Sequence, residues 1–365
     1  MSAQGTPTKS PTPILMSPRD DSYHLQTSQR YNFWQTSQKS LISLNFSQDD
    51  NIVRNKISQR SQTLMKGSCF SPILPSCGDA QQDIVYCSQI RPPSFDWIVY
   101  QDDDVESVSQ YCEGIICEYR KNDLAYSPRE NLFSKQSEIG KNDRLEMIKW
   151  MISKTITFKL SSRTLFLAVK IFDRLLVAKK MKKEKLLLYT VCCLSIASKY
   201  NNSFYPQLSA YVKEVNGAFK EDDIIEKELK VINYLNFQIS CTTQTLFVRY
   251  WLNKLKAQIS HARIATFIGI CSLVSDELAI IDTELVAAAV TLITLNTFEI
   301  DYRKTVLAKI VEKLDKEKLK SVVKSIVELV NIEKENDKSP ILQLFTDEEG
   351  DNVCSFYDYT IPEID

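Results

Sequence analysis

Few side chains in this sequence could support catalysis. Only two histidines, His24 and His261, occur in 365 residues, so a nucleophile–histidine–acid set is not credible. Cys69, Cys77 and Cys87 are too widely spaced for the hairpins that usually bind zinc, and no glycine-rich loop is present to cradle a phosphate. We therefore expect no metal, no cofactor and no enzymatic activity, and we expect the protein to act by binding.

Lys199 is the charged side chain with the most unusual surroundings. It follows a nearly uninterrupted apolar run that begins at residue 186, which is too short to cross a bilayer. A helix that is apolar all round must be enclosed by other helices, and the small residues Cys192, Cys193 and Ala197 would let them approach closely. A lysine at the end of such a helix could simply complement the helix dipole, or it could mark a binding surface. The residues alone leave both interpretations open.

Composition is ordinary for a globular protein, with 44% apolar and 25% charged residues. The net charge of −1 argues against a protein that coats nucleic acid. Ten cysteines without short paired spacings, and no apolar secretory signal, favour reduced thiols in the nucleus and cytoplasm. No apolar run reaches transmembrane length, so we expect no membrane partner.

Residues 1–94 differ from the rest of the chain. They contain eight of the twelve prolines and no glutamate, and Ser, Thr and Gln dominate. Such a segment cannot bury enough apolar surface to offset the entropy of ordering it, so we predict a disordered regulatory tail. Thr6, followed by Pro7 and Lys9, is the best of its sites for a proline-directed kinase, although such dipeptides also arise by chance.

The remainder has a helical composition, because Pro206 is the only proline between Pro128 and Pro340. Residues 95–140 are predicted to form an N-terminal helix, about 103–119, and a linker. Two similar units of five helices follow in 141–240 and 241–333, each centred on an apolar third helix, which indicates a duplicated all-α domain. Residues 334–365 are polar and are expected to form a loose C-terminal tail. The predicted helices span about 143–154, 162–178, 186–200, 205–215 and 221–235, then 242–256, 262–275, 284–297, 302–314 and 316–332.

Four segments of the first unit point to a family. In order and spacing, RLEMIKWM, LAVKIFDRLL, LSIASKYNNSFYPQLSAYV and IEKELKVINYLNFQIS resemble the cyclin box. The resemblance implies an all-α fold of tandem five-helix cyclin domains. It also implies a non-catalytic subunit that binds and activates a cyclin-dependent kinase as a heterodimer, and so controls the cell cycle.

The resemblance assigns a kinase interface to particular positions. In the family, a lysine at the end of the third helix and a glutamate in the fifth contact the mobile helix of the kinase, and Lys199 and Glu228 are the matching residues. Tyr200, Phe237 and Ile239 are the apolar residues expected to supply most of the buried contact. Charged groups at the edge of such an interface set its orientation more than its affinity.

Two further sets of residues match features of the family. Arg144 and Asp173 match a buried ion pair between the first two helices of the box, which is structural. Lys334, Glu335 and Asn336 form a KEN tripeptide that resembles a degron read by a ubiquitin ligase, and its place in a predicted loose tail would make it accessible. Three-residue motifs also occur by chance.

The substrate-docking patch of the family is only partly present. Met147, Trp150 and Leu187 occupy its positions, but Asp143 and Glu146 put two acidic residues among them. Docking by this patch is therefore doubtful, and an acidic variant would favour more basic peptides.

Two other kinds of function use the same fold. A transcription-factor type would bind DNA and polymerase, but the zinc ribbon and basic helices expected of it are not visible, and the lysine-rich run 179–185 is expected to be a solvated loop. A scaffold would bind a kinase without activating it. The sequence cannot separate the scaffold from the activator.

Overall fold

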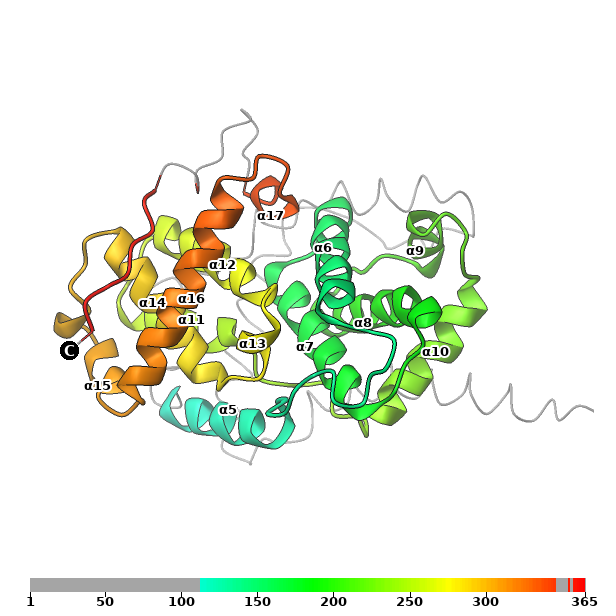
Figure 1. Cartoon of the computed structure of the whole chain (residues 1–365), viewed down its shortest axis with the longest axis horizontal. Helices are drawn as coiled ribbons and strands as arrows, with labels where there is room; N and C mark the ends of the chain where they lie inside the picture. The colour runs from blue at the N-terminus through cyan, green and yellow to red at the C-terminus, as the bar shows by residue number, and fades with distance from the viewer. Residues whose placement is uncertain (1–111, 346–353, 355–356, 365) are drawn as a thin grey trace, which may run out of the picture. The chain divides into compact units, whose positions relative to one another are not determined.

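The computed structural model describes residues 112–345, 354 and 357–364, which form helices joined by loops, with no strand among them (Figure 1). The all-α prediction is confirmed for these residues. The predicted disordered tail 1–94, the site at Thr6 and the start of the predicted N-terminal helix lie outside the described residues.

The first helical unit is built around α8, the predicted central helix. Its side chains from Leu188 to Ser198 are all buried, and it contacts α6, α7 and α10. Cys192, Cys193 and Ala197 are fully buried, as expected for residues that let neighbouring helices approach closely. The unit consists of α6 (Lys141–Thr157), α7 (Ser162–Ala178), η3 (Lys183–Lys185), α8 (Leu186–Asn201), α9 (Leu208–Glu214) and α10 (Glu221–Tyr234).

Local chemistry sets the limits of these helices. Ser161 caps α7, because its Oγ accepts a hydrogen bond from the backbone N–H of Thr164 at 3.3 Å. The α6 helix begins earlier than predicted, because the Asp143 carboxylate accepts a hydrogen bond from the Gly140 N–H at 2.8 Å. The α9 helix begins later than predicted, at Leu208, after an extended Gln207.

The second unit repeats the plan around α14. This helix is buried along residues 283–295 and contacts α11, α12 and α16. The predicted continuous helix 302–314 is wrong, because Thr305 is extended and its Oγ1 donates to the Tyr302 carbonyl, which ends a short 3₁₀ turn. The unit consists of α11 (Gln244–Lys254), α12 (Ile259–Leu273), α13 (Asp276–Ala279), α14 (Thr283–Thr297), η4 (Tyr302–Lys304), α15 (Leu307–Val311) and α16 (Lys316–Lys334).

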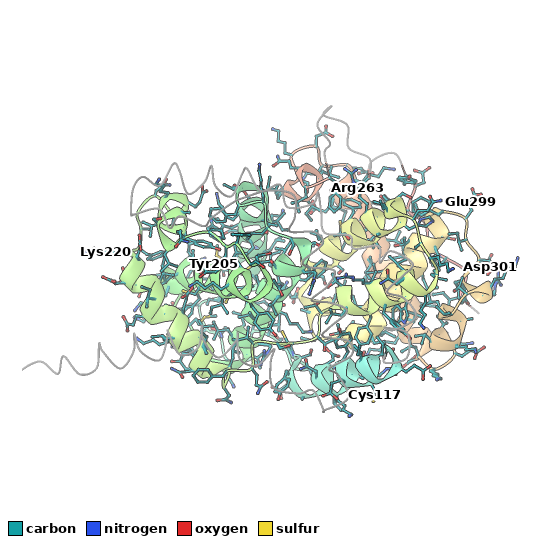
Figure 2. All side chains as sticks on the ribbon, turned by 180° about the vertical axis from the view of Figure 1, so that it is seen from behind. Cys117, Tyr205, Lys220, Arg263, Glu299 and Asp301 are labelled. Carbon is teal, nitrogen blue, oxygen red and sulfur yellow. The ribbon has the colours of Figure 1, made fainter. Side chains whose placement is uncertain are left out.

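The helix that precedes the first unit, α5 (Cys112–Tyr126), connects the two units. Cys117 marks this helix in Figure 2. Its Arg120 pairs with Glu284 of α14, with 2.6 Å between Nη2 and Oε1. Its Asn122 accepts a hydrogen bond from the N–H of Thr242, in the linker between the units, at 2.8 Å. The α5 helix therefore ties the second unit to the end of the first.

The described part of the C-terminal segment is packed, so the prediction of a loose tail is wrong there. A short helix, α17 (Pro340–Gln343), contacts α6 of the first unit. The rings of Phe345 and Tyr359 pack against Phe267 of α12, with centroid distances of 5.4 and 5.7 Å. Polar residues between these anchors gave the sequence a tail-like composition.

Ser339→Ala is expected to destabilise the fold by about 1–3 kcal/mol, because it would remove the hydroxyl that donates to the buried carboxylate of Glu333. The buried Ser339 hydroxyl donates to Oε2 of Glu333 and accepts from the N–H of Ile341 at 3.1 Å, which caps α17. Urea denaturation followed by circular dichroism would measure the change, with the exposed Lys338→Ala as control. Equal stability of the two variants would contradict the prediction.

Candidate functional site

Lys199 and Glu228 form a close ion pair between α8 and α10. The Lys199 Nζ lies 2.8 Å from each carboxylate oxygen of Glu228. The Lys199 side chain is 8% exposed and that of Glu228 is 1% exposed. The expectation that a cation and an anion lie side by side at this point is confirmed. Their contact with a kinase remains a prediction.

Two aromatic side chains of the predicted interface are exposed. Tyr200 follows Lys199 in the last turn of α8, and Phe237 follows α10 with 62% of its surface exposed. Asn236 and Phe237 both have a left-handed backbone, with φ of 50° and 62°. For a bulky residue this conformation is strained, and such strain is concentrated at functional sites. The fold therefore holds Phe237 outward at an energetic cost.

Ile239 does not share this exposure. Its side chain is 3% exposed and belongs to the hydrophobic core. The interface prediction for Ile239 is corrected, because the left-handed turn at Asn236 and Phe237 changes the direction of the chain and Ile239 after it is buried. Its role is to anchor the segment that carries Phe237.

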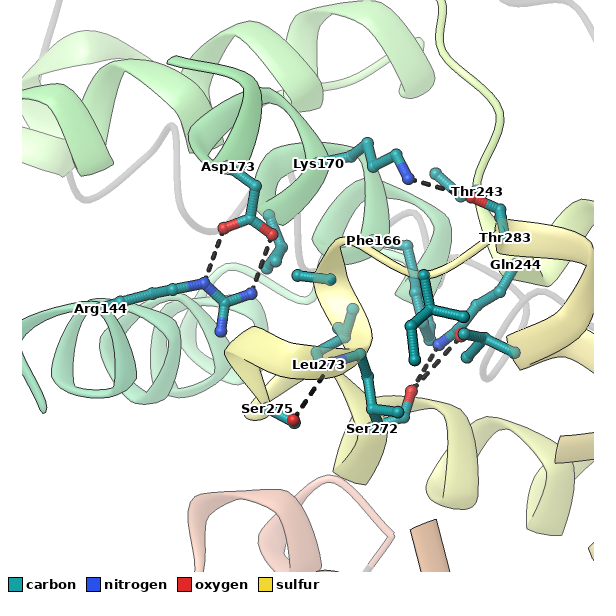
Figure 3. Close-up of a pocket in the computed structure, with 15 residues that line it drawn as sticks. Arg144, Phe166, Lys170, Asp173, Thr243, Gln244, Ser272, Leu273, Ser275 and Thr283 are labelled. Carbon is teal, nitrogen blue, oxygen red and sulfur yellow. Dashed lines mark hydrogen bonds and ion pairs between the residues drawn. The ribbon is translucent and has the colours of Figure 1, made fainter. Parts of the chain in front are cut away.

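Arg144 and Asp173 form the predicted buried ion pair (Figure 3). Nε and Nη2 of Arg144 donate to the two carboxylate oxygens at 2.7 and 2.8 Å. Nη1 of Arg144 also donates to the carbonyl of Val274, in the second unit, at 3.3 Å. The pair therefore joins α6 to α7 and also reaches across to the end of α12.

The sequence reasoning missed a second buried polar cluster, centred on Asp123 of α5. The Asp123 carboxylate binds Arg129 at 2.6 Å and accepts from the Thr283 N–H at 3.2 Å. Lys170 of α7 donates to Thr283 Oγ1 at 3.0 Å, and burial lowers the pKa of Lys170. One signal could have revealed the cluster, because Lys170 interrupts the apolar run from Leu165 to Phe172. A cavity of about 50 Å³ adjoins Lys170 and Arg144 (Figure 3).

The region matched to substrate docking carries less net negative charge than its residue types indicate. Met147, Trp150 and Leu187 are half-buried. The Asp143 carboxylate lies 2.7 Å from the Lys183 Nζ, and this hydrogen bond, with that from Gly140, lowers the pKa of Asp143. Asp143 therefore remains ionised, but its charge is balanced by a neighbour. A docking role for this region remains a prediction.

The KEN tripeptide lies at the end of α16 and not in a loose tail. Lys334 is the last residue of α16, and its Nζ donates to the Tyr357 carbonyl at 2.7 Å. The backbone N–H of Asn336 donates to the Glu333 carbonyl at 3.2 Å. Lys334 is thus held by the packed C-terminal segment, whereas the side chains of Glu335 and Asn336 are exposed, and the degron remains a prediction.

Within the described part of the chain, no group of three or more His, Cys, Asp or Glu side chains is arranged to hold a metal ion. No helix there has both the length and the apolar character needed to cross a membrane. Cys192, Cys193 and Cys271 are buried free thiols, and burial raises their pKa, so they are unreactive core residues.

Sequence comparison matches residues 114–240 to the family model of the cyclin N-terminal domain. The chain is 28% identical over 183 residues to G2/mitotic-specific cyclin-2 of Medicago sativa. The aligned stretch covers 50% of this chain and 56% of the relative. The chain is 32% identical over 117 residues to Cyclin-A1-2 of Arabidopsis thaliana. This aligned stretch covers 32% of this chain and 26% of the relative. The chain thus spans about half or less of the length of these curated relatives.

Structural comparison agrees on the fold. A viral cyclin from herpesvirus saimiri matches with a TM-score of 0.54 and 19% identity, over 60% of this chain and 96% of the viral protein. At this identity the match shows the arrangement of helices and nothing about activity. The family model and the curated relatives lead to one conclusion: residues 114–240 are a cyclin N-terminal domain, so the chain contains a cyclin box in its first helical unit.

Proposed function

We propose that this protein is a non-catalytic regulatory subunit that binds and activates a cyclin-dependent kinase. We also propose that it controls the cell cycle and is located in the nucleus and the cytoplasm. The observation that carries the proposal is the buried pair of Lys199 and Glu228, at the positions where the family contacts the kinase. The similarity to mitotic cyclins supports the cell-cycle role.

The exposed ends of α8 and α10 supply the chemistry for binding. Tyr200 and Phe237 offer apolar surface to a partner, and burial of such surface drives association. The ion pair fixes the angle between the two helices, because a bidentate contact restrains both side chains. A partner helix laid against these ends would meet a preformed surface, which lowers the entropy cost of binding.

Activation would follow by a shift of population. A kinase alone seldom holds its mobile helix in the inward position that completes the lysine–glutamate pair at the phosphates. A subunit that binds the inward state more tightly raises the population of that state in proportion to the difference in affinity. No residue of the subunit then needs to touch the substrate of the reaction.

Phe237→Ala tests this function with little risk to the fold, because the side chain is exposed. We expect the variant to melt like the wild type and to bind the kinase at least about tenfold more weakly, as for an aromatic anchor at an interface. The kinase captured by the wild-type chain would be identified and its affinity for each variant measured. Ile332→Ala, which truncates an exposed apolar side chain of α16, is the control.

Histone phosphorylation by the captured kinase, with and without the subunit, separates an activator from a scaffold. Binding without stimulated phosphorylation would reject activation. Equal affinity of Phe237→Ala and wild type would reject the proposed surface.

A further inference from the structure

A groove of about 720 Å³ opens beside the segment that carries Phe237. Its walls come from the end of α5, the linker after it, the end of α7 and the turn after α10. Asn236 and Gln238, which flank Phe237, both line the groove. The groove is therefore continuous with the surface proposed to bind the kinase.

The groove contains a buried cation that lacks a carboxylate partner. Arg174 of α7 is 9% exposed and lines the groove. Its Nη1 donates to the Gln238 carbonyl at 2.6 Å, and its guanidinium lies over the Tyr126 ring, 5.5 Å from the centroid. Among the described residues no acid forms an ion pair with Arg174. A buried charge without a counter-ion is costly, so the site favours an incoming anion.

The remaining neighbours of Arg174 do not supply that anion. Cys241 is buried beside it, and burial raises the pKa of Cys241, so the thiol stays neutral near pH 7. Asp173, the next residue before Arg174, is engaged by Arg144. The guanidinium thus faces a carbonyl, a ring and a thiol, all of them uncharged.

The charges that line the groove indicate the kind of anion. Arg129 is already paired with Asp123 at 2.6 Å, which leaves Lys135 and Arg174 as cations against one acid, Glu130. Two cations and one anion leave a single positive charge, which matches one carboxylate better than a doubly charged phosphate. Nε and Nη2 of Arg174, which donate to no oxygen of the described chain, form the fork that a carboxylate accepts.

We propose that this groove, the Arg174 groove, receives an aspartate or glutamate side chain of the bound kinase, which pairs with Arg174. The proposal rests on the proposed function, because it concerns how the same partner is held. It adds an electrostatic contact to the ion pair of α8 and α10. This contact lies at the residue after Phe237, because Arg174 donates to the Gln238 carbonyl. The contact would select kinases that carry an acid at this point.

Two exposed residues at the rim provide variants with opposite expected effects. Lys135→Glu is expected to weaken binding of the purified kinase about fivefold at low ionic strength, and Glu130→Lys is expected to strengthen it by a similar factor. Both effects should shrink at high ionic strength, because salt screens exposed charges. Lys313→Glu, an exposed charge reversal in the second unit, is the control and should bind like the wild type.

Arg174→Gln tests the buried cation itself. It should weaken binding about 30-fold or more with little dependence on salt, because the pair would be desolvated. Its melting temperature is measured in parallel, and if this variant does not fold, the opposite shifts of the two rim variants still decide the question.

The possible results separate the two proposals. If the wild-type chain captures no kinase, the proposed function and the Arg174 groove fail together. If a kinase is captured but Lys135→Glu, Glu130→Lys and wild type bind it equally, only the groove proposal is overturned. Loss of binding after phosphatase treatment of the kinase would also overturn it, since the anion would then be a phosphate. Restored binding of Lys135→Glu by an acid-to-lysine change in the kinase would identify the carboxylate.

Discussion

Arg144→Ala is expected to lower the free energy of unfolding by about 3–5 kcal/mol, the usual cost of breaking one side of a buried ion pair. Arg144 is 1% exposed and makes both hydrogen bonds to Asp173. Truncation would leave the Asp173 carboxylate buried and uncompensated. The variant would also lose the bond to the Val274 carbonyl, so the junction between the two units would weaken as well. Urea denaturation of the purified chain would measure the loss.

Two further variants make this result specific. Asn142→Ala, on an exposed position of the same helix, should leave stability unchanged. Arg144→Met combined with Asp173→Leu removes both charges and keeps most of the volume, so it should recover a large part of the lost stability. If Arg144→Ala unfolds at the same urea concentration as the wild type, the pair is not structural.

The helical plan could be predicted because its signals are local. The α7 helix has the predicted limits, since Ser161 supplies its cap and the apolar period continues to its end. Burial of α8 and α14 followed from apolar residues on every face, which only an enclosed helix tolerates. Lys199 and Glu228 came together as expected because the resemblance fixed the register of α8 against α10.

The parts that sequence reasoning missed depend on contacts between distant segments. Nothing near Tyr359 shows that its ring will pack on Phe267, more than 90 residues away. Asp123 acquires its partners from α7 and α14, so its burial cannot be read from α5 alone. The direction of Ile239 is a similar case, because it depends on the left-handed turn at Asn236 and Phe237, which no glycine announces.

Exchange of the two charges of the candidate site, as Lys199→Glu with Glu228→Lys, is expected to abolish kinase binding and to leave the fold largely intact. Single substitutions cannot test the site cleanly. Both side chains are nearly fully buried, so removal of either charge would leave the other uncompensated and would destabilise the chain by about 3–5 kcal/mol. The exchange keeps one cation and one anion between α8 and α10, so their attraction is retained.

A kinase that contacts both residues would instead meet a negative charge in place of the lysine and a positive charge in place of the glutamate. We expect its affinity to fall at least about 100-fold, because reversal of desolvated charges at an interface costs about 2–5 kcal/mol or more. The measurement is the affinity for the kinase captured by the wild-type chain, with melting temperature recorded for each variant. The chain offers a control in Lys154→Glu with Glu214→Lys, which exchanges a partly buried ion pair between α6 and α9. If both exchanged variants melt like the wild type and bind the kinase equally well, Lys199 and Glu228 only hold the helices together, and the kinase must be recognised elsewhere. If only the exchange at Lys199 and Glu228 abolishes binding, the same pair both fixes the two helices and orients the partner.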